Sequence, residues 1–112
     1  MDILIQADGL ELTEALRAAI EEKIGRVEQL APRAVRARVR VRKVSAHPSA
    51  RQYLVRVLCE LPGQDLSAED AGPDPLSAVD IVAAKIERRI RKRKTDRLAR
   101  RARTSPRVRE KS

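Results

Sequence analysis

The sequence predicts an α+β domain in which two helices cover one face of a four-stranded sheet, in the order β-α-β-β-β-α. Apolar residues alternate with polar ones over residues 34–44 and 51–61, which is typical of strands with one buried face. Apolar residues also recur at helical spacings over residues 16–27 and 76–90. Two amphipathic helices are therefore available to cover that face, which predicts a two-layer sandwich.

The first strand and helix are predicted in the N-terminal third of the chain. The strand is expected over residues 1–7, before the turn signal Asp8-Gly9. Thr13 is a suitable N-cap for the helix, and Ala31-Pro32 ends it. Gly25 weakens this helix by up to about 1 kcal/mol relative to alanine. Its apolar stripe consists of Leu16, Ile20, Ile24 and Val27.

The remaining strands follow the same period of two. Over residues 34–44 the small apolar side chains point to one face and four arginines to the other. The next strand, residues 51–61, carries Tyr53 and Cys59 on its inner face. The turn Pro62-Gly63-Gln64 leads into a short fourth strand over residues 65–70. We name the four outward residues the arginine ladder: Arg36, Arg38, Arg40 and Arg42.

The second helix is predicted to begin at Asp74-Pro75, an N-cap followed by proline at the first helical position. It should project beyond the core to about residues 95–103, because its apolar residues end at Ile90 while its charges continue. The stretch from Thr104 to Ser112 is expected to be disordered. The apolar stripe of the helix consists of Leu76, Val79, Ala83, Ile86 and Ile90.

Composition limits the class of protein. No segment reaches the roughly 20 apolar residues that span a bilayer, and the N-terminus is acidic where a signal peptide is basic. With Cys59 as the only cysteine, we expect a reducing, cytoplasmic location. His47 is a lone loop histidine, and we find no metal-ligand cluster, phosphate-binding glycine loop or nucleophile–base pair. We therefore predict no enzymatic activity, metal or cofactor.

Charge is concentrated at the C-terminal end. Residues 1–84 hold 11 Lys/Arg against 13 Asp/Glu, whereas residues 85–112 hold 14 against 3. Eleven of these cations lie between residues 85 and 103, and favouring the dipole of a helix end needs only two or three. Such a helix favours a polyanion, with nucleic acid as the leading candidate and an acidic membrane surface as the second.

Two further features qualify this interpretation. The arginine ladder is either a second phosphate-contacting surface or a solvent face kept charged against aggregation. Tyr53 is the only aromatic residue and belongs to the inner face, so bases cannot stack on an exposed aromatic platform. We expect recognition of structured RNA by its shape and phosphates, with little reading of bases.

Four ordered segments resemble the ribosome hibernation promoting factor family, also named ribosome-associated inhibitor or sigma-54 modulation protein. These segments are Leu12-Thr13-Glu14-Ala15-Leu16-Arg17 with residues 20–24, Gly63 to Glu69, Asp74 to Asp80, and Lys85 to Lys94. The resemblance covers about residues 1–97, which we assign as one ribosome-binding domain, with 98–112 as a basic, disordered C-terminal tail. Leu76 stands where the family often has an aromatic residue, and Pro75 replaces a non-proline.

The resemblance implies a fold similar to double-stranded-RNA-binding domains. It also implies a binding place between the head and body of the small ribosomal subunit, on the paths of mRNA and tRNA. The basic positions of the family's second helix match Lys85, Arg88, Arg89, Arg91, Lys92 and Lys94. On the first helix, Arg17 and Lys23 match basic positions. The chain resembles a short form, without the C-terminal dimerisation domain of the long form.

Together these observations predict a translation inhibitor that acts by occupancy and makes or breaks no bond. Its expected partners are the small subunit and the 70S ribosome, through 16S rRNA, with no membrane and no small-molecule substrate. A protein-binding regulator that modulates a sigma factor is one alternative. A generic module for structured RNA, without preference for ribosomes, is the other.

Overall fold

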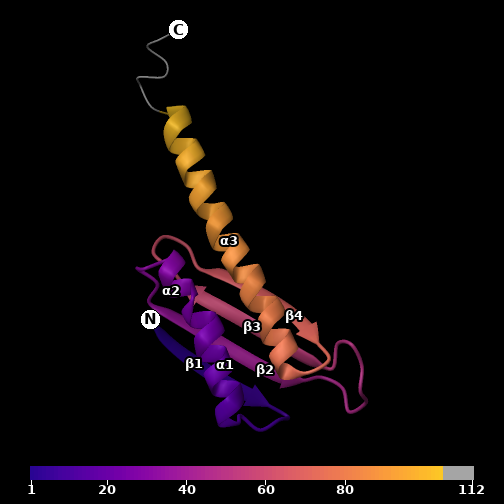
Figure 1. The fold of residues 1–112 in the computed structure, drawn as a ribbon. Helices are drawn as coiled ribbons and strands as arrows, with labels where there is room; N and C mark the ends of the chain where they lie inside the picture. Colours follow the sequence, from indigo (N-terminus) through magenta and orange to yellow (C-terminus); the bar gives the residue numbers. More distant parts are fainter. Residues whose placement is uncertain (105–112) are drawn as a thin grey trace.

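The four predicted strands pair in chain order to form one mixed sheet (Figure 1). The computed structural model describes residues 1–104, with side chains as far as Arg100. The strands are β1 (Asp2–Asp8), β2 (Arg36–Lys43), β3 (Tyr53–Glu60) and β4 (Leu66–Gly72). β1 pairs parallel to β2, and the other two pairs are antiparallel. The fourth strand continues two residues beyond its predicted end.

All helices lie on one face of this sheet, which confirms the two-layer α+β architecture (Figure 1). They are α1 (Glu14–Gly25), α2 (Val27–Leu30) and α3 (Pro75–Thr104). The prediction of a single helix up to Ala31 is wrong, because the helix is interrupted at Arg26. The interruption directly follows Gly25, which lacks a Cβ and therefore restricts the helical backbone less than other residues do. Val27 is nevertheless fully buried, so the apolar stripe continues across the break.

Both predicted N-caps are confirmed. The Thr13 hydroxyl accepts a hydrogen bond from the Leu16 amide at 3.1 Å. The Asp74 carboxylate accepts one from the Ser77 amide at 2.8 Å and another from the Ser77 hydroxyl at 2.9 Å. These hydrogen bonds hold the pKa of Asp74 below its usual value, because they favour the charged carboxylate. Each helix therefore has a defined starting residue.

The core is aliphatic and lies between the sheet and the helices. α3 contributes Val79, Val82 and Ile86, all fully buried. The predicted stripe is wrong at Leu76, which is 47% exposed. The first turn of α3 instead places Ala78 against Gly72, where an added Cβ would lie 2.9 Å from the Ala78 amide nitrogen. The first turn of α3 thus contacts the strand through Ala78, and Leu76 lies outside the buried face.

α3 extends well beyond the sheet (Figure 1). Its last buried residue is Ile90, and the helix continues to Thr104. The expected disorder of the tail is wrong for residues 98–104, Thr104 included, because they continue α3, and for 105–112 the expectation lies outside the described residues. The division at residue 97 stays a prediction. Within residues 1–104 no helix is both long and apolar enough to cross a membrane.

Candidate nucleic-acid interface

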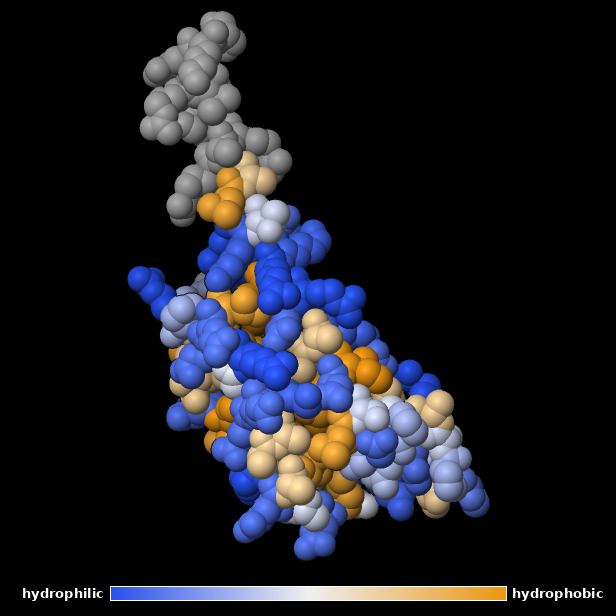
Figure 2. All heavy atoms as spheres, in the orientation of Figure 1, coloured by the Kyte–Doolittle hydropathy of each residue, from blue (hydrophilic) through white to orange (hydrophobic). Residues whose placement is uncertain are grey.

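The helix that carries the cations, α3, is anchored to the core by two buried isoleucines on its inner side. Ile86 and Ile90 are 0% and 2% exposed and belong to the core cluster. Beyond Ile90 hydrophilic side chains cover α3 where it leaves the body of the domain (Figure 2). The helix is thus anchored along one side and presents cations over the rest of its circumference, as predicted.

Lys85 is not a free cation. Its Nζ lies 2.7 Å from Oδ2 of Asp70 on β4 and donates to the Glu69 carbonyl at 3.4 Å. Asp70 also accepts a hydrogen bond from Arg51 at 3.3 Å. Lys85, the Ala71 amide and Arg51 together lower the pKa of Asp70 to about 2. Lys85 therefore joins α3 to the edge of the sheet.

One and two helical turns further along α3, Arg89 and Arg93 continue along the same edge. Arg89 donates to the Ser67 carbonyl, and Arg93 donates to the carbonyls of Gln64 and, at 2.6 Å, Pro62. These carbonyls belong to β4 and to the turn that precedes it. Cations at a spacing of four residues thus satisfy main-chain acceptors of the sheet's edge strand. The positions of these cationic side chains are therefore fixed by hydrogen bonds within the protein.

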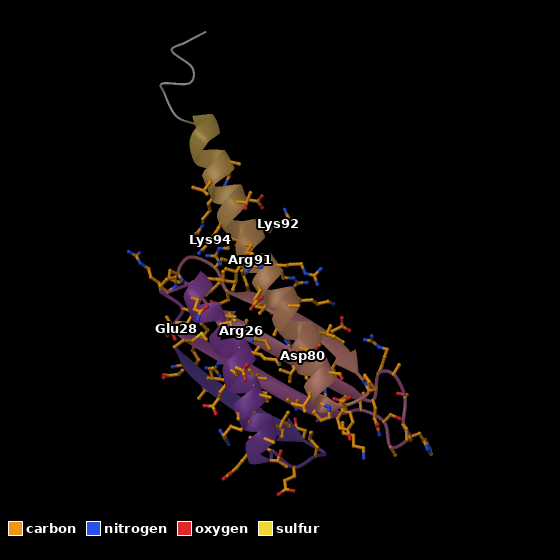
Figure 3. The ribbon with its side chains drawn as sticks, viewed as in Figure 1. Arg26, Glu28, Asp80, Arg91, Lys92 and Lys94 are labelled. Atoms are coloured by element: carbon orange, nitrogen blue, oxygen red, sulfur yellow. The ribbon has the colours of Figure 1, made fainter. Side chains whose placement is uncertain are left out.

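Three further cations of α3 point to solvent. Arg88, Arg91 and Lys92 share the side of the helix opposite the core, and we name them the outer ridge. Lys92 pairs with Asp96 at 3.3 Å, an exposed contact that stabilises little. Arg88 and Arg91 form no ion pair or side-chain hydrogen bond within the described residues. Lys94 also has none there, and it lies on the side of α2 (Figure 3).

The two predicted cations of α1 differ in their surroundings. Arg17 is exposed and has no ion-pair partner in the described part of the chain. Lys23 pairs with Asp80 of α3 at 2.8 Å, and Figure 3 shows Asp80 near the start of that helix. Lys23 therefore links the two helices, and Arg17 is the freer of the two.

The arginine ladder lies on the face of the sheet that no helix covers. Arg42 is exposed and forms no ion pair among residues 1–104. The other three are partly neutralised by carboxylates of neighbouring strands: Arg36 and Arg38 pair with Glu60 at 3.6 and 3.1 Å, and Arg40 with Asp8 at 2.7 Å. The ladder is thus a weaker positive surface than its sequence indicates.

The ladder and the outer ridge lie on opposite sides of the domain, because the helices and the ladder arginines occupy different faces of one sheet. The structure therefore does not bring the twelve predicted residues into one patch. A flat partner could contact one surface only, whereas an enclosing partner could contact both.

Sequence reasoning missed three cations that lie close together: Arg33, Arg93 and Arg97 line one hollow with Lys94. Arg93 and Arg97 are one helical turn apart, a spacing that could have indicated a shared face. Arg33 is 60 residues from Arg93 in the sequence, and no local pattern connects them.

The remaining reactive groups give no catalytic arrangement. Cys59 is fully buried, and burial raises the pKa of its thiol to about 11, which keeps it protonated and unreactive. His47 is exposed in the loop between β2 and β3, where its main chain bonds only to Ser45. Within residues 1–104 no group of three or more His, Cys, Asp or Glu could hold a metal.

Two curated relatives share about a third of their residues with this chain. The ribosome hibernation promotion factor of Lactococcus lactis is 33% identical over 96 residues, and that of Staphylococcus aureus is 36% identical over 94. Each match covers 81% of this chain, but only 48% and 47% of the relative. The chain therefore spans about half the length of these relatives.

Two solved structures share the fold. A ribosomal subunit interface protein from Coxiella burnetii superposes with a TM-score of 0.74 and 22% identity, covering 85% of this chain and 99% of its own. The N-terminal domain of Thermus thermophilus Protein Y gives a TM-score of 0.70 and 22% identity, with 82% and 98% covered. Both are covered almost completely, so their length matches the domain seen here.

The shared fold defines the class as an α+β domain with the architecture of these two solved structures. Residues 3–98 match the family described as sigma 54 modulation protein / S30EA ribosomal protein, and the chain belongs to that family. The resemblance seen in the sequence is thereby confirmed. The family consists of ribosome-associated factors rather than enzymes.

Proposed function

We propose that this chain silences translation in the cytoplasm by binding the 16S rRNA of the small subunit, alone or within the 70S ribosome. There it would fill the channel between head and body and exclude mRNA and tRNA. The observation that carries this proposal is the outer ridge, a set of exposed cations fixed to a rigid helix by Ile86 and Ile90. The names of the curated relatives support the ribosome as partner.

The physical mechanism is phosphate binding followed by steric exclusion. Each cation that meets a phosphate releases condensed counterions from the RNA, and this release drives association. A long helix anchored on one side keeps its cations in a fixed row without ordering them at the moment of binding. Once bound, the domain blocks other ligands by its volume alone, so no reaction is required.

A channel also explains why the predicted residues lie on two sides. An enclosing RNA surface would meet the outer ridge, Arg17 and Lys94 on the helical side, and the arginine ladder on the open face of the sheet. Lys85, Arg89 and Lys23 would then act mainly by positioning α3. The half-buried Tyr53, the only aromatic side chain, fits recognition of RNA shape rather than base identity.

The proposal is tested by sedimenting the protein with ribosomal subunits and 70S particles through sucrose gradients. We expect the wild-type protein to sediment with 30S and 70S particles and to be displaced by bound tRNA. The double variant Arg88→Glu, Arg91→Glu should lose most of this binding, because both side chains are exposed and structurally unpaired.

The matched control is Arg26→Glu, Lys43→Glu, which changes the net charge equally. Lys43 ends β2 and is exposed, and Arg26 pairs with Glu22 in an exposed contact at 3.5 Å that stabilises little. This control should bind ribosomes nearly as well as wild type. Full binding by the ridge variant, with an unchanged melting temperature, would disprove the proposal.

Binding experiments with the same protein and ribosomes can distinguish this proposal from two rival functions. A sigma-factor modulator, which the family description also names, would bind a protein partner after nuclease treatment. A generic RNA-binding module would be displaced from ribosomes by an equal mass of bulk duplex RNA at physiological salt. We expect neither result.

A further inference from the structure

A hollow of about 320 Å³ lies where α3 passes over α2 and over the turn between β3 and β4. Its walls are apolar and come from three separate parts of the chain: Leu30, Ala31, Pro32, Leu61, Pro62 and Ile90. Hydrophobic surface is visible among hydrophilic residues at the end of the body from which α3 projects (Figure 2). We name this hollow the α2–α3 groove. Its volume is at the lower limit for small-ligand sites.

The rim of the groove is strongly cationic. Arg33, Arg93, Lys94 and Arg97 line it, and no carboxylate does. Arg93 is held in place by its bonds to the turn carbonyls, so its guanidinium has a fixed position at the rim. The other three form no ion pair or side-chain hydrogen bond within the described residues. An occupant should therefore combine a flat or compact apolar body with negative charge.

We propose that the α2–α3 groove receives one unstacked nucleobase of the bound RNA, while its flanking phosphates contact Arg33, Lys94 and Arg97. This inference rests on the proposed RNA binding and adds a specific ligand group to it. Unstacked bases in single-stranded loops and bulges pack on guanidinium planes as well as on aromatic rings. Arg93 supplies such a plane, and the proline and leucine side chains supply the apolar contact.

RNA fits the groove better than an acidic peptide because of where the rim lies. Lys94 and Arg97 belong to the same helix as the outer ridge but to its α2 side, so an RNA that wraps around α3 from the ridge would bring its next phosphates beside the groove. Few side-chain hydrogen-bonding groups other than cations line the walls. The site should therefore accept any base and prefer an RNA with an unpaired nucleotide over a continuous duplex.

Two RNA hairpins of equal length test this inference: one is fully paired, and the other carries a single bulged nucleotide. We expect the wild-type protein to bind the bulged hairpin about tenfold more tightly, the effect of stacking one base. In the variant Ala31→Trp, an indole should fill the groove and abolish the preference, leaving affinity for the paired hairpin unchanged. The matched control Ala46→Trp, in the exposed loop between β2 and β3, should behave as wild type.

A second variant, Arg33→Ala with Arg97→Ala, covers the case in which Ala31→Trp does not fold. It should lower the preference for the bulged hairpin at least threefold, because two of the four rim cations are lost and the apolar walls stay. Equal binding of both hairpins by wild type would overturn the groove proposal and leave RNA binding intact. Binding of neither hairpin would remove the RNA binding on which the groove proposal rests. Binding of a peptide that contains Leu and Glu, in a protein that binds neither hairpin, would assign the groove to an acidic peptide instead.

Discussion

The Asp70 carboxylate interacts with two cationic side chains and one main-chain amide. Lys85, the Ala71 amide and Arg51 lower its pKa to about 2, from an ordinary value near 4. A carboxyl whose pKa is lower in the folded state stabilises the fold above its unfolded pKa, and this contribution disappears as pH falls through the folded pKa. Asp70 should therefore stabilise the protein at neutral pH and contribute progressively less between about pH 5 and pH 2.

This leads to a measurable difference between Asp70→Asn and wild type. In urea denaturation at pH 7 the variant should unfold at lower urea, because Lys85 and Arg51 lose their charged acceptor. The gap should narrow as the pH is lowered and close near pH 2. Asp96→Asn is a suitable control, since the exposed Asp96–Lys92 pair should stabilise little at any pH. A gap that stays constant with pH would contradict the assignment.

At the scale of elements, two glycines should respond in opposite ways to the same substitution. Nothing lies within 4 Å of a Cβ added at Gly25, whereas one added at Gly72 would meet the Ala78 backbone at 2.9 Å. Gly25→Ala should stabilise the protein by about 0.5–1 kcal/mol by favouring the helical backbone. Gly72→Ala should destabilise it by about 1–3 kcal/mol, because α3 must move away from β4.

Urea denaturation at pH 7 measures both effects, with Thr13→Ala as a calibration of about 1 kcal/mol for the loss of one helix cap. Gly25→Ala should move the midpoint to higher urea and Gly72→Ala to lower urea. An unchanged midpoint for Gly72→Ala would mean that α3 does not depend on its close contact with the strand.

Most elements were predictable because they rest on local periodicity. The strands of the arginine ladder and of Tyr53 were indicated by alternation, and both N-caps by residue type. The break after Gly25 was visible only as a weak point, since tertiary packing decides whether such a helix bends or continues. Leu76 was misplaced because periodicity indicates the centre of the buried face but not where its margins lie, and the first turn of α3 contacts the sheet through Ala78 instead.

The candidate site was less predictable than the fold for a related reason. The run from Lys85 to Lys94 indicated many cations but not which of them face the protein. The acceptors of Arg89 and Arg93 are main-chain carbonyls, which leave no signature in the side-chain sequence. The α2–α3 groove was not predicted at all, because its walls come from three distant segments.

At the scale of the whole molecule, the excess of positive charge lies in the part of the chain that includes the projecting end of α3. Residues 1–84 carry a net charge of −2 and residues 85–112 one of +11. The body neutralises much of its own charge through ion pairs such as Arg40–Asp8 and Lys23–Asp80. Long-range attraction to a polyanion should therefore orient the protein with α3 forward, and affinity should depend steeply on salt.

The salt dependence of binding can test which cations of α3 contact phosphates and which ones contact the protein itself. With about 6–8 phosphate contacts, a log–log plot of the association constant for 30S subunits against salt should have a slope of roughly −5 to −7. Arg91→Ala should reduce the magnitude of this slope by about 1, because one phosphate contact is lost. Lys85→Ala removes the same charge from the same helix, yet it should change the slope far less, since Lys85 is paired with Asp70.

Titrations of both variants at four or five salt concentrations, with wild type in parallel, measure the three slopes. Equal reductions by the two variants would show that Lys85 leaves Asp70 to bind phosphate, and the division into edge-facing and outward-facing cations would then be wrong.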